Sequence, residues 1–375
     1  EILARQHFAT ITRMLEGMDV KTAVLTGSSK AKERRLALEG IASGEVDILI
    51  GTHALIEDRV QFSNLGFVVI DEQHRFGVEQ RARLWTKNEQ PPHILVMTAT
   101  PIPRTLAMTL YGDLDVSVID ELPPGRQPIR TVHYTDAARL RLFGFMRQEI
   151  KKGRQIYVVY PLIKESETMD YKDLQDGYEA ISRDFPLPEY VTTICHGKMK
   201  PEDKEESMRQ FKSGEANIMV ATSVIEVGVD VPNATVMVIE SAERFGLSQL
   251  HQLRGRVGRG SQQSYCILMS GEKLSKEARL RLEAMCETND GFRLAELDLK
   301  LRGAGDVNGT LQSGMAFDLK IANPTLDSQI LTVTREAAAE VLTADPTLTQ
   351  NGHEGLRELR KRYSGREEID FSQIS

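Results

Sequence analysis

The amino-acid sequence predicts an α/β fold, with two doubly wound parallel-sheet domains followed by a mostly helical C-terminal extension. Short apolar segments alternate with helical patterns over the first 272 residues. Acidic or hydroxyl residues follow several of these segments, at the place where ligands of open α/β sheets bind. Beyond residue 272 the strand patterns stop, and apolar residues recur at helical spacing.

The first domain is expected to span residues 1–126. Its strand candidates are short apolar segments, many of them β-branched: Val20–Leu25, Val46–Ile50, Phe67–Ile70 and Ile94–Met97. The segment Leu122–Pro128 is rich in Pro and Gly, which favours a linker to the next domain.

The second domain is expected to span residues 127–272. A helix is predicted over Met199–Gly214, with Pro near its first turn and Gly past its end. The polar and acidic segment Glu165–Pro188 is interpreted as a surface loop or a short helix. The strand candidates are Gln155–Tyr160, Val191–Cys195, Ile218–Ala221, Val236–Ile239 and Tyr265–Leu268.

The third region, residues 273–375, is expected to be helical. Ser275–Cys286 and Phe292–Leu299 carry apolar residues at helical spacing. The basic segment Arg357–Arg366 could reach DNA phosphates, but a solvated terminal helix is the favoured interpretation.

Two carboxylates, Asp71 and Glu72, follow the strand candidate that ends at Ile70. A carboxylate in this place can hold Mg²⁺, directly or through water, and the next one can orient and deprotonate an attacking water. A solvated strand end is the alternative. The following Gln73-His74 and the arginines far downstream favour the catalytic interpretation.

Two arginines spaced by glycines lie in the segment QLHQLRGRVGR at Gln249–Arg259. We expect Arg256 and Arg259 to lie on the first turn of a helix, where this spacing puts both guanidinium groups on one face. The guanidinium group binds phosphate oxygens bidentately and keeps its charge, so the pair suits a triphosphate. A solvated turn is the alternative.

A further strand-end motif is LVMTATPIPR at Leu95–Arg104. Thr98 and Thr100 could hydrogen-bond the acidic pair and sense the state of the γ-phosphate. The prolines that follow stop any helix and stiffen the chain. The alternative is an ordinary strand followed by a turn.

In this order and spacing, the segments DEQH, TATPIPR and QLHQLRGRVGR resemble motifs II, III and VI of superfamily 2 helicases and translocases. LYGDLDVSVIDELPPGR at Leu110–Arg126 and DGFRLAELDLKLRGAGDVNGTLQSG at Asp290–Gly314 narrow the resemblance to the RecG family. The resemblance covers nearly the whole chain. It implies RecA-like domains and an ATP- and Mg²⁺-dependent translocase that remodels stalled forks and branched double-stranded DNA in repair and recombination.

The resemblance also implies roles for individual residues. Asp71 and Glu72 would hold Mg²⁺ and activate water, and Arg256 and Arg259 would stabilise the transferring phosphoryl group. Nucleotide contacts are implied for Gln252, Gly228 and Asp230. Coupling of hydrolysis to movement is implied for Thr98, Thr100, Arg302 and Gln312. DNA-backbone contacts are implied for Gly51, Thr52, His196, Gly197, Thr222 and Ser223.

The sequence contains no string of the form GxxxxGK[ST], the phosphate-binding loop that such enzymes need. The nearest string, Gly27-Ser28-Ser29-Lys30, lacks the second glycine and the hydroxyl residue after the lysine. We therefore expect a C-terminal fragment of a RecG-like protein, with a truncated first domain and no wedge domain, which does not hydrolyse ATP alone. Loss of a central strand would leave two exposed strand edges in the first sheet.

Composition argues against a general attraction to nucleic acid. With 47 Lys and Arg against 54 Asp and Glu, the net charge is −7, so DNA binding would depend on local patches. The three cysteines have no metal-like spacing, which suits a reducing cytoplasm. We expect a cytoplasmic, nucleoid-associated bacterial protein with no membrane partner, which acts as a monomer when intact.

Two other functions remain open. The nearer is the translocase module of a transcription–repair coupling factor, which shares TATPIPR and the loop containing Gln312. The other is a nucleic-acid-binding module without catalysis. The acidic pair and the two arginines argue against the second, because such a module would have no use for them.

Overall fold

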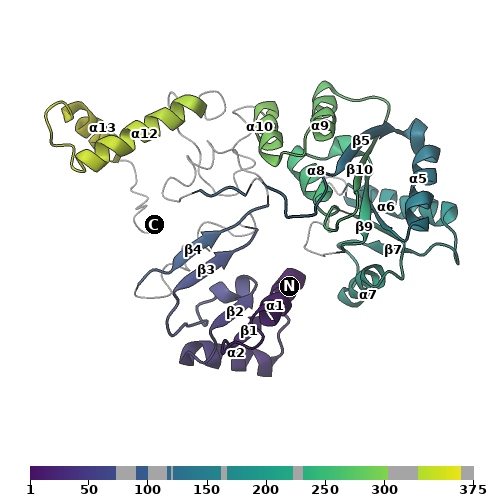
Figure 1. Cartoon of the computed structure of the whole chain (residues 1–375), viewed down its shortest axis with the longest axis horizontal. Helices are drawn as coiled ribbons and strands as arrows, with labels where there is room; N and C mark the ends of the chain where they lie inside the picture. The colour runs from purple at the N-terminus through teal and green to yellow at the C-terminus, as the bar shows by residue number, and fades with distance from the viewer. Residues whose placement is uncertain are drawn as a thin grey trace. The chain divides into compact units, whose positions relative to one another are not determined.

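The computed structural model describes residues 1–72, 90–99, 116–119, 121–161, 167–222, 231–302 and 328–364 (Figure 1). The chain divides into two compact units. The first comprises Glu1, Phe8–Ile119 and Leu299–Ser375, and the second comprises Ile2–His7 and Asp120–Asp298. The division into residues 1–126, 127–272 and 273–375 stays a prediction.

The second unit is built on a six-stranded sheet in the order β5-β10-β9-β6-β8-β7, in which every pair of neighbours is parallel (Figure 1). The strands that were predicted are all present. They are β6 (Gln155–Tyr160), β7 (Thr192–Cys195), β8 (Ile218–Thr222), β9 (Ala234–Ile239) and β10 (Tyr265–Ser270).

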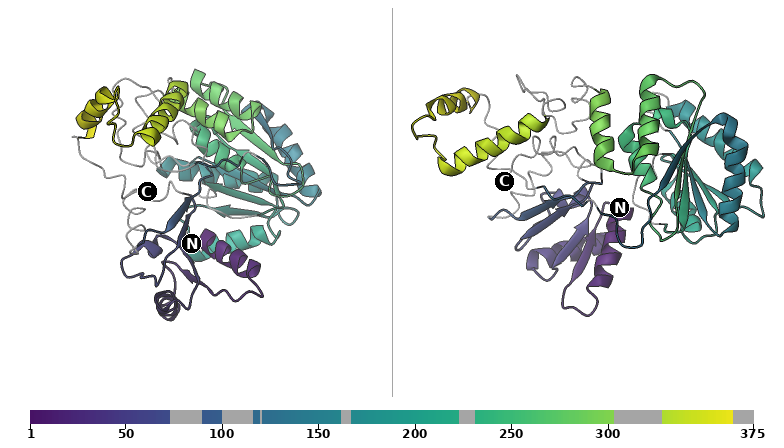
Figure 2. Two further views of the ribbon diagram at one scale, coloured as in Figure 1. Left: turned by 60° about the vertical axis from the view of Figure 1, so that its left-hand side comes forward. Right: turned by 45° about the horizontal axis from the view of Figure 1, so that its top comes forward.

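Helices cover both faces of this sheet, as parallel sheets require (Figure 2). Ile156 and Val158 of β6 belong to one apolar cluster with residues of α5 and α6. Tyr157, between them in sequence, packs against Phe211 on α7, with the ring centroids 4.7 Å apart and the ring planes tilted by 48°. The helices are α5 (Arg139–Lys151), α6 (Glu167–Asp184), α7 (Pro201–Lys212), α8 (Leu247–Arg254), α9 (Lys276–Glu287) and α10 (Gly291–Arg302), of which α10 continues past the last residue of this unit, Asp298.

Two features of this unit differ from the sequence prediction. The edge strand β5 (Arg130–Thr135) was not predicted, because its residues RTVHYT are polar and only partly covered. The segment expected as a loop or short helix forms α6, which has 18 residues. Leu174 and Ile181 recur at helical spacing and are buried in the core, which explains the length of this helix.

The first unit contains four strands in two separate sheets. β1 (Thr22–Leu25) pairs in parallel with β2 (Ile48–Gly51), and β3 (Phe67–Ile70) pairs in parallel with β4 (His93–Val96). All four were predicted. Within the described residues no strand joins the two pairs, which is consistent with exposed strand edges. Its helices are α2 (Ala31–Ser43) and the short η1 (His53–Ile56), and α1 (Ile2–Met14) contributes residues to both units.

The β3–β4 pair has one uncovered apolar face. Phe67 is 59% exposed, Val69 is 50% exposed and Leu95 is 47% exposed. On the opposite face, Ile70 and Ile94 pack around Ile56 of η1. Both faces of a parallel sheet are usually covered by other elements. Within the described residues, one face of this strand pair has no such cover.

The last described helices, α12 (Ser328–Ala344) and α13 (Glu354–Ser364), are joined by a turn centred on Asp345. This side chain is 4% exposed. Its Oδ2 atom accepts hydrogen bonds from Gln350 N and from His353 Nδ1, both at 2.8 Å. These donors hold the pKa of Asp345 well below its usual range, and the Gln350 N–H contributes most.

We predict that Gln155→Leu lowers the free energy of unfolding of the second unit by about 1–3 kcal/mol. The buried Nε2 atom of Gln155 donates to Phe211 O at 2.5 Å and to Ala216 O at 2.8 Å. Phe211 O would still accept from the Gly214 N–H at 3.2 Å, but Ala216 O would lose this donor, and an unsatisfied buried carbonyl costs about 1–3 kcal/mol. Urea unfolding measures the change. The control is Gln175→Leu on α6, which removes only an exposed bond to Glu179, and an equal loss in both variants would contradict the prediction.

We predict that the α12–α13 turn loses its structure on acidification and that Asp345→Asn removes this dependence. Because its pKa is lowered by folding, the ionised Asp345 stabilises the fold fully at pH values above the ordinary aspartate pKa of about 3.9. This contribution is lost as the pH falls through the pKa of the folded state. The measurement is an acid titration of the Gln350 and His353 amide resonances. Glu340→Gln, an exposed change on α12, should leave the titration unaltered. A titration unaffected by Asp345→Asn would refute the assignment.

Candidate nucleotide and DNA site

The predicted acidic pair lies at the carboxyl end of β3. Both Asp71 and Glu72 are partly buried, and the Glu72 N–H donates to Asp71 Oδ1 at 2.8 Å. Glu72 has a φ of 52°, in the left-handed region that non-glycine residues rarely occupy. Strained backbone conformations cluster at functional sites. Gln73 and His74 lie outside the described residues.

Thr98 lies at the same sheet edge as the acidic pair. β3 and β4 run in parallel and in register, with Ile70 opposite Val96. The Met97 N–H donates to Ile70 O at 2.8 Å, so the pairing extends to the residue before Thr98. The structure therefore brings together the ends of the two strands from which the sequence predicted chemistry. Thr100 lies outside the described residues.

The predicted DNA-contact residues Gly51 and Thr52 lie at the end of β2. Gly51 faces Leu25 of β1, and a Cβ atom on Gly51 would lie 2.1 Å from Leu25 O. Glycine is therefore required by the close approach of the two backbones. The Thr52 Oγ1 atom is buried and has no hydrogen-bond partner within the described parts of the chain.

His196 and Gly197 follow β7 and precede α7, as predicted. The Gly197 carbonyl accepts a hydrogen bond from Lys204 Nζ at 3.5 Å. Burial lowers the pKa of His196, and the nearby charges of Lys204 and Lys198 lower it further. His196 is therefore neutral at neutral pH.

Thr222 ends β8, the strand beside β7, where Cys195 pairs with Ala221. It thus lies at the same sheet edge as His196. Its side chain is fully buried, and its hydroxyl has no hydrogen-bond partner among the residues that the structure describes. The remaining predicted residues of this motif, Ser223, Gly228 and Asp230, lie outside the described residues.

The expectation that Arg256 and Arg259 lie on the first turn of a helix is wrong. α8 ends at Arg254, and both arginines lie in the turn that follows it, where each is partly buried. The glycines explain the difference: Gly255 caps the helix, and Gly258 has a φ of 76° that ends any helical continuation. Gln252 lies on the last turn of α8.

Sequence reasoning missed Arg254, which precedes these arginines. It is 2% exposed. Its Nη1 atom donates to Met285 O at 3.0 Å and to Thr288 O at 2.8 Å, and its Nη2 atom donates to Asn289 O at 3.3 Å. Burial lowers the pKa of its guanidinium group. Arg254 follows Leu253 and lies on the apolar side of α8. This position in the helical pattern is the sequence signal that could have predicted that the arginine is buried.

A second missed feature is the ion pair between Arg139 and Glu240. Glu240 follows β9 and is 5% exposed. Arg139 Nη1 and Nη2 donate to its two carboxylate oxygens at 2.8 and 2.9 Å. This bidentate contact raises the pKa of Arg139. It fixes the chain just before Ser241, whose φ of 48° starts the turn toward α8.

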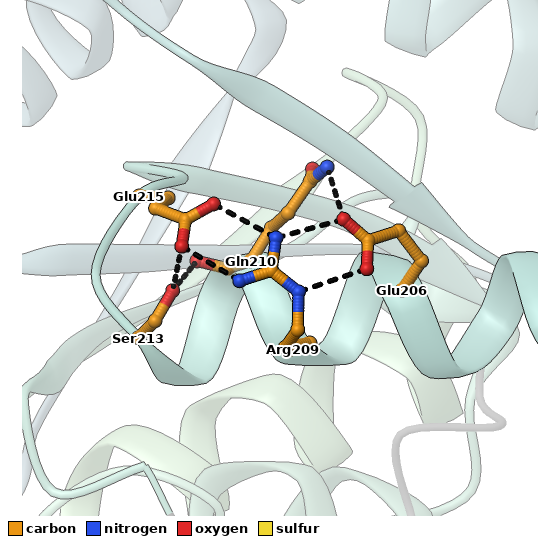
Figure 3. A network of polar contacts seen from close by, with 5 residues as sticks. All are labelled: Glu206, Arg209, Gln210, Ser213 and Glu215. Atoms are coloured by element: carbon orange, nitrogen blue, oxygen red, sulfur yellow. Dashed lines mark hydrogen bonds and ion pairs between the residues drawn. The ribbon is translucent and has the colours of Figure 1, made fainter.

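An exposed polar network closes the C-terminal end of α7 (Figure 3). Arg209 contacts the carboxylates of both Glu206 and Glu215, with donor–acceptor distances of 2.7–3.0 Å. Ser213 and Gln210 complete it. Exposed ion pairs contribute little free energy to stability. We therefore infer that the network mainly sets the conformation of the turn that leads into β8.

Within the described segments, no group of three or more His, Cys, Asp or Glu side chains is placed to hold a metal ion. Asp71 and Glu72 nevertheless fit Mg²⁺, which is usually bound by one or two carboxylates together with waters and substrate phosphates. No helix in these segments is long and apolar enough to cross a membrane.

Three family models match successive parts of the chain. Residues 1–109 match the DEAD/DEAH box helicase model, and residues 139–261 match the helicase conserved C-terminal domain. Residues 288–375 match ATP-dependent DNA helicase RecG, domain 3, C-terminal.

Individual relatives agree with these models. ATP-dependent DNA helicase RecG of Bacillus subtilis is 50% identical over 345 residues, which is 92% of this chain and 50% of that protein. The Escherichia coli K12 protein of the same name is 47% identical over 368 residues, which is 97% of this chain and 53% of that protein. The chain thus spans about half the length of these relatives. Neither the coupling-factor alternative nor the non-catalytic one is favoured.

Solved structures give the same result. The structure of RecG bound to a three-way DNA junction has a TM-score of 0.69 and 42% identity, covering 88% of this chain and 42% of that one. Yeast Dbp5 bound to RNA and ADP BeF3 has a TM-score of 0.55 at 14% identity, over 80% of this chain and 78% of that one, which supports the fold alone. Sequence, fold and domain order agree, and this chain belongs to the RecG family of ATP-dependent DNA helicases.

Proposed function

We propose that this chain is the helicase region of an ATP-dependent translocase of double-stranded DNA, acting on forked and branched substrates. The observation that carries the proposal is the convergence of Asp71, Glu72 and Thr98 at the carboxyl edge of β3 and β4. Nucleotides bind at this edge in open α/β sheets. The RecG relative bound to a three-way junction supports the choice of branched DNA.

In this proposal, residues 1–126 bind the nucleotide and activate water. Asp71 holds Mg²⁺ with Glu72, and Glu72 orients and deprotonates the attacking water. When bound, Mg²⁺ supplies positive charge to the phosphate oxygens. Thr98 and Thr100 respond to the state of the γ-phosphate.

Residues 127–272 supply the cationic groups. Arg256 and Arg259 stabilise the charge of the transferring phosphoryl group, which arginines do effectively because the guanidinium fork matches phosphate oxygens. Gln252, Gly228 and Asp230 contact the nucleotide. Arg302 and Gln312, in residues 273–375, pass the motion on to DNA.

The proposed DNA contacts are made to the backbone. In the first unit they come from Gly51 and Thr52, and in the second from His196, Gly197, Thr222 and Ser223. Phosphate contacts hold a strand without reading its bases, so sequence specificity should be low and affinity should fall steeply with salt. We further propose that the intact protein acts as a monomer in the bacterial cytoplasm, associated with the nucleoid.

We predict that the 375-residue chain alone does not hydrolyse ATP, because its sequence has no GxxxxGK[ST] string to cradle the phosphates. A form extended upstream through such a loop should hydrolyse ATP and be stimulated by three-way junction DNA. The measurement is steady-state phosphate release by both forms, with and without the junction. Turnover by the shorter chain would show that the phosphates are held by other residues.

In the extended form, Arg256→Ala and Arg259→Ala should each lower kcat by about 10³-fold or more, the loss typical of arginines that stabilise phosphoryl transfer. Arg209→Ala is the matched control, because it removes an arginine of the same domain from an exposed network only. Circular dichroism verifies that the variants fold. Rates within a few-fold of the unaltered form would exclude both arginines from catalysis.

We predict that His196 contributes to DNA affinity without a charge at neutral pH. Burial and two lysines lower its pKa, so protonation occurs only below the ordinary histidine pKa of about 6.5. Junction binding by the unaltered chain and by His196→Asn should therefore change in parallel between about pH 7 and 8. Fluorescence anisotropy at fixed salt measures both. A gain in affinity on acidification that only the unaltered chain shows would refute a neutral His196.

A further inference from the structure

The helix α13 carries a stripe of basic side chains. Arg357, Arg360 and Lys361 are three and four positions apart, so helical spacing places them on one side of the helix. All three residues are exposed. Leu356 and Leu359 fall on a separate side of the helix, where they are 45% and 49% exposed. The helix therefore presents these three cations apart from its leucines.

The two acidic residues of α13 lie beside the basic stripe rather than within it. Glu354 Oε2 accepts a hydrogen bond from the Gly352 N–H at 3.0 Å, at the start of the helix. The N–H groups of Glu354 itself and of Gly352 lower the pKa of this carboxylate, and the charge of Arg357 also lowers it. Glu358 is four positions further along and lies on the same flank. The stripe thus forms a local excess of positive charge on a chain whose net charge is −7.

A hydrogen-bonded turn fixes the start of α13. The buried Asp345 carboxylate accepts from Gln350 N and from His353 Nδ1, both at 2.8 Å, just after the end of α12. The Arg357 N–H donates to His353 O at 3.0 Å, which joins this turn to the first turn of α13. The basic stripe is therefore held in one arrangement before any ligand binds, and this lowers the entropy lost on binding.

The chemistry of the stripe suits phosphate groups. Arginine binds phosphate oxygens bidentately, and lysine adds a compact positive charge. Residues 357 and 361 are separated by about one helical turn, roughly 6 Å along the axis, so the cations can reach successive parts of one backbone. Arg360 Nη1 donates to Pro346 O at 3.4 Å in an exposed contact. A phosphate can replace this long hydrogen bond with a shorter, charge-assisted one.

A membrane surface is the other polyanion that a basic amphipathic helix can bind. Insertion into a membrane needs a large apolar face, whereas α13 has 11 residues and exposes only about half of Leu356 and Leu359. The position of the cations on their own side of the helix favours a ligand that carries its charge along a backbone. The observations therefore favour nucleic acid.

We propose that the stripe formed by Arg357, Arg360 and Lys361 binds the sugar–phosphate backbone of duplex DNA. This contact is separate from the strand-end residues to which DNA binding is assigned above. It carries no sequence information, because phosphates are the same at every base pair. The proposal rests on the proposed function, since it takes DNA as the partner. It gives α13 a role in holding DNA and none in the hydrolysis of ATP.

Junction binding by the 375-residue chain tests the proposal, with fluorescence anisotropy of a labelled three-way junction as the measurement. The triple variant Arg357→Gln/Arg360→Gln/Lys361→Gln removes the three charges and keeps good helix formers. Its Kd should be about tenfold higher or more at roughly 0.1 M salt. The slope of log Kd against log salt concentration should fall by about 2–3, because each phosphate contact contributes about 0.9. Circular dichroism verifies that the helices are retained.

The matched control is the variant Lys151→Gln/Arg183→Gln/Lys212→Gln, which removes the same charge from exposed positions. These residues lie in the last turns of α5, α6 and α7, each of which leads into a strand of the parallel sheet. They therefore lie near its amino edge, away from the DNA contacts proposed at its carboxyl edge. The control should bind the junction within a few-fold of the unaltered chain. An equal loss in both variants, or no loss in the triple variant, would overturn the proposal.

Vesicles of phosphatidylglycerol provide the comparison with a membrane surface. The unaltered chain should not bind them at the salt concentration at which it binds the junction. Vesicle binding that the triple variant loses, together with unchanged junction binding, would overturn the proposal in favour of a membrane contact.

A form of the protein that hydrolyses ATP separates this proposal from the proposed function. In that form, the triple variant should raise the junction concentration for half-maximal stimulation by about tenfold or more and leave kcat at saturating junction within a few-fold. A fall in kcat alone would overturn the proposal. If the unaltered protein binds the junction without DNA-stimulated hydrolysis, the proposed function fails, and anisotropy still decides the role of α13. Absence of junction binding by the unaltered chain would overturn both.

Discussion

Parallel strand pairing is the constraint on which the rest of this structure depends. Because every paired strand runs in one direction within its sheet, residues that follow different strands gather at a single edge. Asp71 and Thr98 lie at the same sheet edge in this way, although 27 positions separate them in sequence. His196 and Thr222 meet for the same reason at the edge of the second sheet. The scaffold thus brings its candidate functional groups together from strand ends rather than from a single loop.

Three nearby arginines in the second domain have different environments. Arg254 is buried and faces backbone carbonyls, whereas Arg256 and Arg259 are partly buried and follow the helix end. Gly255 separates these environments, because the helix ends there and the chain changes direction. The anchoring of one arginine therefore fixes the starting point of the turn that presents the other two. Upstream, the pair of Arg139 with Glu240 fixes the chain on the way into this helix.

Most strands could be predicted from sequence because a parallel sheet covered on both faces requires uninterrupted apolar segments, such as Ile218–Ala221. β5 could not, because an edge strand needs only partial cover and tolerates Arg, Thr and His. The positions of Asp71, Glu72 and Thr98 at strand ends were predictable from the same pattern. The roles of Arg254 and Glu240 were not, because their partners are distant in sequence and, for Arg254, are carbonyl groups that every residue type carries. The placement of Arg256 and Arg259 on a helix was wrong because the neighbouring glycines have two possible effects. Glycine lets a backbone or a ligand come close, and it also ends helices, and the spacing of the residues alone does not separate these effects.

Gly51 shows how a residue without a side chain can restrict what the chain tolerates. The nearest backbone oxygen, on Leu25, leaves no room for even one additional carbon atom. A substitution at this position would therefore separate β1 from β2 before it altered any surface offered to a ligand. A loss of activity after such a change would therefore reflect the altered spacing of the two strands. From the phenotype alone, however, position 51 would be mistaken for a residue that contacts the ligand.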